Sequence, residues 1–192
     1  MHKLNRSAES QTCFYGEESL HKVERIVIIG CPGSGKSTLA RELGEILNLT
    51  VVHLDRLWWK KGWENVTREE FDTRLKNAMA MEKWIIDGNY SRTMDTRLKK
   101  CDTIIWLDYS RWACLWGVFQ RAFLNRGKTR PDMAEGCPER LDWEFVKYVW
   151  NFNKNNRVLN ETRIAKSKHA HAIVLSNRKE KQAFLKKLEN DL

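Results

Sequence analysis

Short apolar runs alternate with longer amphipathic stretches along most of the chain, from about residue 25 to residue 188. The runs are rich in Ile and Val, as expected for strands that are buried on both faces. We predict strands at residues 25–29, 51–54, 84–86, 103–107 and 171–175. Strands that alternate with helices predict an α/β fold in which a five-stranded parallel sheet is covered by helices on both faces, giving three layers.

The stretches between these strands repeat their apolar positions every three or four residues, which is typical of helices. One helix is predicted directly after the first strand, and another begins at the capping pair Thr67 and Glu70. Helices are also predicted over residues 141–159 and 179–188. The strongest stripe predicts a markedly amphipathic helix and consists of Trp112, Leu115, Trp116, Phe119 and Phe123.

Length and composition fit one globular domain, because 192 residues with 42% hydrophobic side chains can bury a core. Residues 1–22 are polar and without a clear period, so we predict an N-terminal extension there and one domain over 23–192. The net charge of +9 lies entirely in the second half of the chain. Residues 97–130 alone hold eight basic and two acidic side chains, a surplus of +6 that favours an anionic ligand.

The five cysteines are odd in number and widely spaced, with no C-x-x-C pair. This usage is typical of free thiols in a reducing compartment, so we predict a cytoplasmic protein. The N-terminus has no apolar signal segment, and no run approaches the roughly 18 apolar residues that a membrane span needs. We therefore expect no membrane association, whereas the sequence leaves the oligomeric state open.

A glycine-rich segment at residues 30–37 follows the first predicted strand and fits the pattern G-x-x-x-x-G-K-[ST]. Backbone N–H groups of such a loop surround a phosphate, and the next helix points its positive end at the same anion. Lys36 is expected to reach the β- and γ-phosphates of ATP. The residues predicted to bind ATP are Gly30, Cys31, Pro32, Gly33, Ser34, Gly35, Lys36, Ser37 and Thr38.

The hydroxyl of Ser37 is expected to bind Mg²⁺, together with a carboxylate that ends a neighbouring strand. Asp87 and Asp108 each end a predicted strand. We favour Asp87, because Gly88 lets the chain turn tightly at the edge of the sheet where ligands bind. The alternative role for Asp108 is to cap the following helix.

The P-loop together with the segment Asp87–Arg92 resembles the plan of nucleoside monophosphate kinases. The chain is more similar to the bacterial DNA topology modulation proteins, a kinase-like family related to adenylate kinase. The similarity covers about residues 24–188 and rests on His53–Trp63, on Trp84–Tyr90 and on Thr129–Met133 through Gly136–Arg140. The Trp-rich segment and the Arg-Pro-Asp segment are the most specific of these. It implies a P-loop kinase-like domain with an acceptor-side insertion at about 55–82 and a short lid loop at about 126–140.

This resemblance also implies roles for several arginines. Arg121, Arg126 and Arg130 would bring positive charge to the transferred phosphate as the lid closes. Arg92 and Arg56 would both hold an acidic group of the acceptor. Ser176–Arg178 would lie near the adenine ring.

Asp55 ends the second predicted strand, where the acceptor site of such a kinase begins. It is expected to orient an acceptor hydroxyl for attack, and the alternative is a carboxylate that caps a turn. Trp58, Trp59 and Trp63 follow closely. They either stack on a planar substrate or pack the insertion onto the core, and we favour packing for at least two of them. Adenylate kinases lack this cluster, which argues against AMP as the acceptor.

Together these features predict a kinase that transfers the γ-phosphoryl group of ATP, with Mg²⁺, to a small nucleotide-like or phosphorylated acceptor. One alternative is an ATP-dependent regulator that binds DNA. It is supported by a surplus of five basic residues over 141–192 but by no nucleic-acid-binding motif. The other alternative is a P-loop NTPase without a dedicated acceptor.

Overall fold

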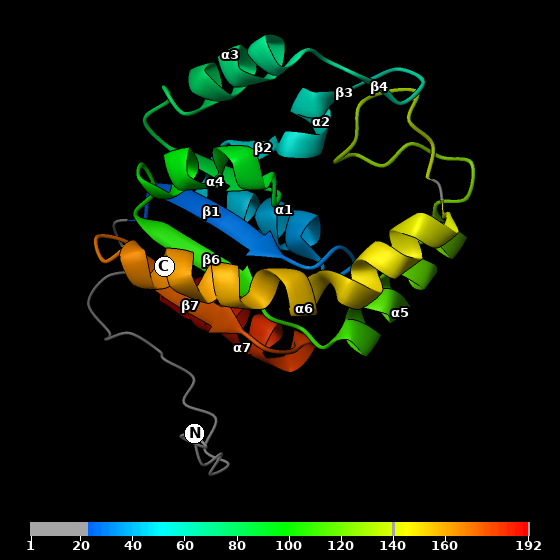
Figure 1. Ribbon diagram of the computed structural model, residues 1–192. Coiled ribbons are helices and arrows are strands. Elements are labelled where there is room, and N and C mark those ends of the chain that lie inside the picture. The colour runs from blue at the N-terminus through cyan, green and yellow to red at the C-terminus, as the bar shows by residue number, and fades with distance from the viewer. Residues whose placement is uncertain (1–22, 140, 192) are drawn as a thin grey trace, which may run out of the picture.

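Five parallel strands form the central sheet of the computed structural model, in the order β2-β5-β1-β6-β7 (Figure 1). The strands are β1 (Arg25–Gly30), β2 (Val51–His53), β5 (Trp84–Asp87), β6 (Thr103–Leu107) and β7 (His171–Leu175). All five predicted strands are therefore confirmed, each within one residue of its predicted bounds. The structure describes residues 23–139 and 141–191. The predicted extension at 1–22 and Arg140 of the predicted lid lie outside the described residues.

Seven helices and a short antiparallel hairpin complete the described part of the chain. The hairpin is β3 (Trp59–Lys60) with β4 (Glu64–Asn65). The helices are α1 (Lys36–Leu47), α2 (Leu54–Trp58), α3 (Arg68–Ala78), α4 (Ser91–Leu98), α5 (Arg111–Leu124), α6 (Trp143–Lys166) and α7 (Arg178–Asn190). The predicted cap of α3 is confirmed, because Oγ1 of Thr67 accepts from the backbone N–H of Glu70 at 3.1 Å.

The sheet divides the core into two clusters, one on each face (Figure 1). Alternate residues of β1 belong to different clusters, since successive strand side chains point to opposite faces. Ile26 and Ile28 pack with residues of α1, α5 and α7, whereas Val27 and Ile29 pack with residues of α3 and α4. The predicted three-layer P-loop fold is thus confirmed. Among the described residues, no helix is long and apolar enough to span a membrane.

Two local features around the acceptor side differ from the prediction. Leu54 opens helix α2 instead of ending the strand, so Asp55 lies in the first turn of a short helix. The aromatic segment that follows then forms the β3–β4 hairpin, which the sequence pattern did not indicate. Only two residue pairs join its strands, too few for an alternation of apolar and polar side chains to be visible.

Helix α6 is seven residues longer at its C-terminal end than predicted, despite its many asparagines. Asparagine disfavours helix interiors because its side chain competes for backbone hydrogen bonds. Here Nδ2 of Asn151 donates to the carbonyl of Lys147, and Nδ2 of Asn156 donates to that of Phe152, both at 2.9 Å. These bonds point back along the helix, so they do not interrupt it.

The aromatic stripe of α5 does not face the core as an amphipathic helix would require. Cys114, Leu115 and Val118 are the buried residues of this helix. Trp112 is 67% exposed and Phe123 is 83% exposed, with Trp116 and Phe119 between them also exposed. Asp108, the alternative helix cap, does not cap α5 either, because Oγ of Ser110 accepts from the N–H of Ala113. Asp108 instead forms an ion pair with Arg157.

Candidate active site

The P-loop joins β1 to α1 and packs directly against α5. Gly33 has φ +81° and Gly35 has φ +92°, which are conformations that favour glycine. A Cβ atom added to Gly117 of α5 would lie 2.0 Å from the carbonyl oxygen of Gly33. A Cβ on Gly33 would lie 2.2 Å from the carbonyl oxygen of Cys114. Two glycines on different elements therefore allow the loop and the helix to touch.

The first turn of α1 presents its N–H groups without a side-chain cap, since Gly35 occupies the N-cap position. Oγ of Ser34 is buried in the loop and has no hydrogen-bond partner among the described residues. Nζ of Lys36 donates to the carbonyl of Cys31 at 3.0 Å. Burial lowers the pKa of Lys36, and the charge of Asp87 partly opposes that shift. Uncapped N–H groups, an unpartnered hydroxyl and a desolvated ammonium together fit an anion such as a phosphate.

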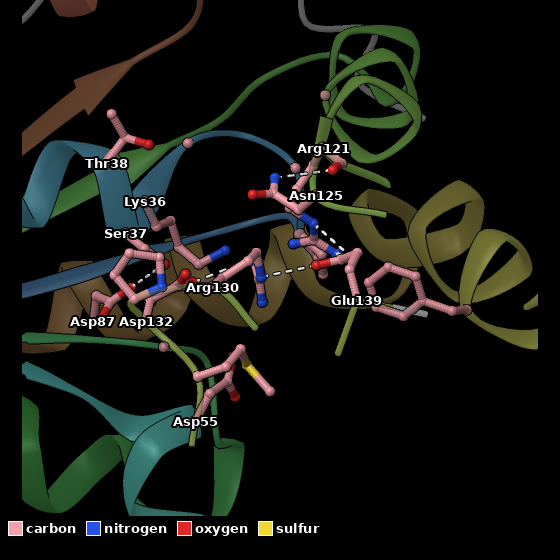
Figure 2. A pocket seen from close by; sticks show the side chains of 18 of the residues that line it. Lys36, Ser37, Thr38, Asp55, Asp87, Arg121, Asn125, Arg130, Asp132 and Glu139 are labelled. Carbon is pink, nitrogen blue, oxygen red and sulfur yellow. Dashed lines mark hydrogen bonds and ion pairs between the residues drawn. The ribbon is translucent and has the colours of Figure 1, made fainter. Parts of the chain in front are cut away.

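Asp87 is the last residue of β5 and lies beside the P-loop, as the sequence predicted. Oγ of Ser37 donates to its Oδ2 at 2.8 Å (Figure 2). Its Oδ1 shares a hydrogen bond with Nδ1 of His53. A hydroxyl and a carboxylate this close fit Mg²⁺, which binds one or two protein ligands together with substrate phosphates and water. Consistent with so few protein ligands, residues 23–139 and 141–191 contain no group of three or more His, Cys, Asp or Glu side chains that could hold a metal.

Asp55 faces the same region from α2 (Figure 2). The hydroxyl of Tyr90 donates to its Oδ1 at 2.8 Å. Burial raises the pKa of Asp55 above its usual value, although the hydrogen bond from Tyr90 partly opposes the shift. A carboxylate with a raised pKa is a stronger base than an ordinary one, which suits the removal of a proton from a hydroxyl. Asp55 thus lines the same cavity as the P-loop, from a helix and not from the end of a strand, and its role toward an acceptor hydroxyl stays a prediction.

Arg97, a fully buried residue of α4, binds the backbone of the loop that carries Tyr90. Its guanidinium donates to the carbonyls of Gly88, Asn89 and Tyr90 at 2.9, 2.8 and 3.2 Å. Asn89 in turn bonds both backbone groups of Gly30, so the loop after β5 is fixed to the start of the P-loop. Arg97 therefore orients the partner of Asp55 from outside the cavity.

Two of the three predicted lid arginines converge on one carboxylate. Arg121 and Arg130 bond different oxygens of Glu139, at 2.9 and 2.8 Å, and Arg130 also pairs with Asp132 (Figure 2). Burial lowers the pKa of Arg121. Burial alone would raise the pKa of Asp132, but the charge of Arg130 and the nearby hydroxyl of Ser37 bring it below its usual value. Two guanidinium groups are thus positioned beside the P-loop, oriented by carboxylates that we did not predict as site residues.

The remaining predicted arginines lie outside the cavity. Arg92 forms a bidentate ion pair with Asp72 of α3, with N–O distances of 2.6 and 2.9 Å. Arg56 and Arg126 are exposed and do not line the cavity. The structure therefore does not bring Arg56 or Arg92 to the acceptor side, and their predicted roles find no geometric support.

One cavity of about 1100 Å³ is lined by Lys36, Ser37, Asp55, Asp87, Arg121 and Arg130. Its walls come from the P-loop, α2 and the hairpin, the loop after β5, α5, the 130–139 segment and the start of α6. Trp58, Trp59 and Trp63 all line it, and so does Arg178 of the predicted adenine-contacting segment. The cavity is therefore large enough for a nucleotide and a second small molecule.

The order of the strands and the glycine-rich loop between β1 and α1 define a P-loop fold of the NTPase and kinase class. Residues 26–107 match a family model described as an AAA domain. This match covers less than half of the chain. No protein in the curated set matches the sequence.

Solved structures show the same fold over nearly the whole chain. Shikimate kinase from Acinetobacter baumannii, in complex with shikimate, has a TM-score of 0.57 and 16% identity, covering 87% of this chain and 91% of that chain. Shikimate kinase from Bacteroides thetaiotaomicron has a TM-score of 0.53 and 16% identity, covering 88% and 97%. The resemblance to the topology modulation family and to adenylate kinases is not shown by these comparisons and stays a prediction.

Proposed function

We propose that the protein is a kinase that transfers the γ-phosphoryl group of ATP, bound with Mg²⁺, to a hydroxyl group of a small molecule. The observation that carries the proposal is the presence of a partly buried carboxylate, Asp55, in the same cavity as the P-loop. A protein that only binds ATP needs no base there. Shikimate kinases, which share the fold, act on a hydroxylated small molecule.

The chemistry assigned to each residue follows from its position. Lys36 and the N–H groups of the P-loop would neutralise the phosphates, while Ser37 and Asp87 would hold Mg²⁺, which would supply further positive charge at the phosphates. Arg121 and Arg130 stabilise the charge of the transferred group. Asp55 accepts the proton of the attacking hydroxyl. ATP supply and buried free cysteines fit a cytoplasmic location, which we include in the proposal.

The experiment is an ADP-release assay with Mg-ATP and a panel of nucleosides, nucleotides, sugars and other alcohols, with mass spectrometry of the products. The proposal requires at least one compound that raises ADP release and becomes phosphorylated. ADP release that no compound raises would overturn it and leave an NTPase. Binding of DNA is a separate prediction. Two of its basic residues, Arg157 and Arg163, already pair with Asp108 and Asp95.

Gly117→Ala is expected to weaken binding of ATP by about tenfold or more, because displacing a loop by roughly 1 Å has effects of this size or larger. The new methyl group would overlap Gly33 and push the P-loop away from α5. Alanine favours the helix by about 1 kcal/mol, but the clash with the Gly33 backbone opposes this gain, so a thermal melt of the variant accompanies the binding measurement. Calorimetric titration with Mg-ATP measures the effect. Trp116→Ala, an exposed neighbour on α5, is the control, and equal affinities of both variants would contradict the prediction.

A further inference from the structure

We infer that the acceptor is an uncharged alcohol with a flat ring, and not a phosphorylated or carboxylated compound. This inference rests on the proposed kinase function and narrows its acceptor. It concerns the part of the cavity beside β2 and β5, which we call the acceptor side. The acceptor side is lined by residues of the 55–63 and 87–90 segments and by Pro131–Met133.

Apart from Tyr90, the ionisable side chains that these described segments contribute to the cavity are all carboxylates. Asp55, Asp87 and Asp132 line it, whereas no Lys or Arg of the same segments does. Arg56 and Lys60, which belong to the 55–63 segment, are exposed, and Lys60 pairs with Glu70 of α3. An anionic acceptor would therefore lie next to carboxylates without a cation of its own. Burying an unpaired charge beside like charges is strongly unfavourable.

The cations that do line the cavity are placed for ATP. Lys36 lies in the P-loop, and Arg41 lies one turn after Thr38 on α1. Arg178 begins α7, which follows β7 at the opposite edge of the sheet. Arg130 is shared between Asp132 and Glu139, and its side chain is only 12% exposed. Arg121 also lines the cavity and pairs with Glu139. Arg130, which directly precedes Pro131 of the acceptor side, and Arg121 thus both have carboxylate partners already.

The uncharged surface there is aromatic and held in place. Trp58 contacts Phe71 and Tyr90 edge-on, with ring centroids 5.4 and 6.1 Å apart. Trp59 and Trp63 contact each other across the β3–β4 turn, with centroids 5.2 Å apart. Indole rings offer flat apolar surfaces on which a base or a sugar ring stacks.

Backbone contacts fix this aromatic wall to the lid loop. The N–H of Gly62 donates to the carbonyl of Gly136 at 3.0 Å, and the thiol of Cys137 donates to the carbonyl of Lys60 at 3.0 Å. The hairpin and the loop after α5 thus lie side by side (Figure 1), and residues of both line the cavity. A ring bound against the tryptophans would have its hydroxyl near Asp55 and would be shielded from water, which protects ATP from hydrolysis.

The test compares matched acceptors in the ADP-release assay: nucleosides against nucleoside monophosphates, sugars against sugar phosphates, and neutral cyclic polyols against shikimate, a carboxylate. We expect kcat/KM for the best uncharged compound to exceed that of its anionic counterpart by about tenfold or more. A preference for the anionic members would overturn the inference and leave the kinase proposal intact. Failure of every compound to raise ADP release would overturn the kinase proposal itself, and the inference with it.

Variants of the aromatic wall provide a second readout. Trp59→Ala and Trp63→Ala are expected to raise KM for the acceptor by roughly 5- to 100-fold, the range found for loss of one stacked ring, with KM for ATP unchanged. Trp143→Ala is the matched control, because this tryptophan is 78% exposed on α6 and does not line the cavity. Equal KM values in the three variants would contradict a role of the wall in binding the acceptor.

The outer surface of α5 and α6 carries an independent signal. We call it the aromatic face and define it as Trp112, Trp116, Phe119 and Phe123 of α5 with Trp143 and Trp150 of α6. The two helices lie side by side, and the rings of Trp112 and Trp150 are 4.9 Å apart (Figure 1). From their exposed fractions, these side chains expose on the order of 800 Å². The largest apolar patch of a monomer is usually about 300–600 Å².

We propose that a second copy of this chain covers the aromatic face, with α5 packed against α5 of the partner. The area matches the roughly 800 Å² that each partner of a stable complex buries. The α5 stripe itself contains no charged residue, and the charge of Arg111 lies over the ring of Trp150 at the α6 side of the face, 4.9 Å from its centroid. Packing α5 against α5 therefore brings two uncharged stripes together.

Sedimentation velocity over a broad concentration range tests this proposal. The expected species has twice the 22.7 kDa mass of the chain. A variant with both Trp116→Asp and Phe123→Asp is expected to sediment as a monomer with unchanged circular dichroism. Val158→Asp, an exposed apolar residue of α6 outside the aromatic face, is expected to stay dimeric. A wild-type monomer at all concentrations, or a monomer that binds anionic vesicles or oligonucleotides through this face, would overturn the proposal.

Discussion

Lys36→Met is expected to lower kcat for phosphoryl transfer by about 10²–10³-fold or more, the range found when one group that stabilises transition-state charge is removed. The ammonium of Lys36 is buried at the P-loop, and burial lowers its pKa. A charge that is desolvated in advance interacts strongly with developing negative charge, because little water screens it. Methionine keeps the length of the side chain and removes that interaction.

The same variant separates catalysis from folding. A lowered pKa means that the folded protein binds the Lys36 proton less tightly than the unfolded chain, so the buried ammonium opposes folding at neutral pH. Removing it is expected to leave the free energy of unfolding in urea equal to or above that of the wild type. Lys61→Met, an exposed lysine of the hairpin, is the control for both measurements. An active Lys36→Met protein would show that the P-loop is not used for transfer.

Local patterns were enough to predict the sheet and the P-loop. Each strand is a run of adjacent residues, and the glycine-rich loop is set by its own sequence between β1 and α1. Asp87 could also be placed beside Ser37, because the carboxyl ends of parallel strands meet at one edge of the sheet. These features depend on few tertiary contacts, which is why residue spacing sufficed.

The acceptor side could not be predicted in the same way, because it depends on long side chains that have several partners to choose from. Arg92 follows Asp87 at the expected spacing, but the nearest carboxylate in the fold is Asp72 of α3. Glu139 and Asp132 lie in segments that the resemblance singled out, yet only the fold shows that they hold Arg121 and Arg130. In these cases tertiary packing decides which charges meet.

The predicted orientation of the aromatic stripe of α5 toward the core was wrong for a related reason. Periodicity identifies an apolar face but not the surface that it meets. In this chain the small residues Gly33 and Gly117 bring the opposite side of α5 onto the P-loop, and that contact fixes the rotation of the helix. The aromatic residues are then turned outward, where a partner rather than the core is available to cover them.

Asp55→Asn is expected to lower kcat by about 10²–10⁴-fold, the usual contribution of a general base. The amide has nearly the same shape and can still accept the hydrogen bond from Tyr90, so the geometry of the site is kept. Only the capacity to take a proton is lost. Wild-type kcat is expected to fall as the pH drops through the raised pKa of Asp55, because protonation removes the base. The variant is expected to lose this acidic limb of its pH–rate profile.

Stability should change in the opposite direction to activity. Because burial raises the pKa of Asp55 in the folded protein above its unfolded value, the ionised carboxylate opposes folding. This loss of stability is absent at pH values below the pKa of Asp55 in the unfolded chain. It grows as the pH rises from that value to the pKa of Asp55 in the folded protein. Asp55→Asn is therefore expected to raise the Tm at neutral pH and to change it little in acid. If burial holds the carboxylate of Asp55 in an unfavourable environment, removing its charge must stabilise the protein. A variant that loses activity and stability together would therefore indicate that Asp55 supports the fold and is not a base held there for catalysis.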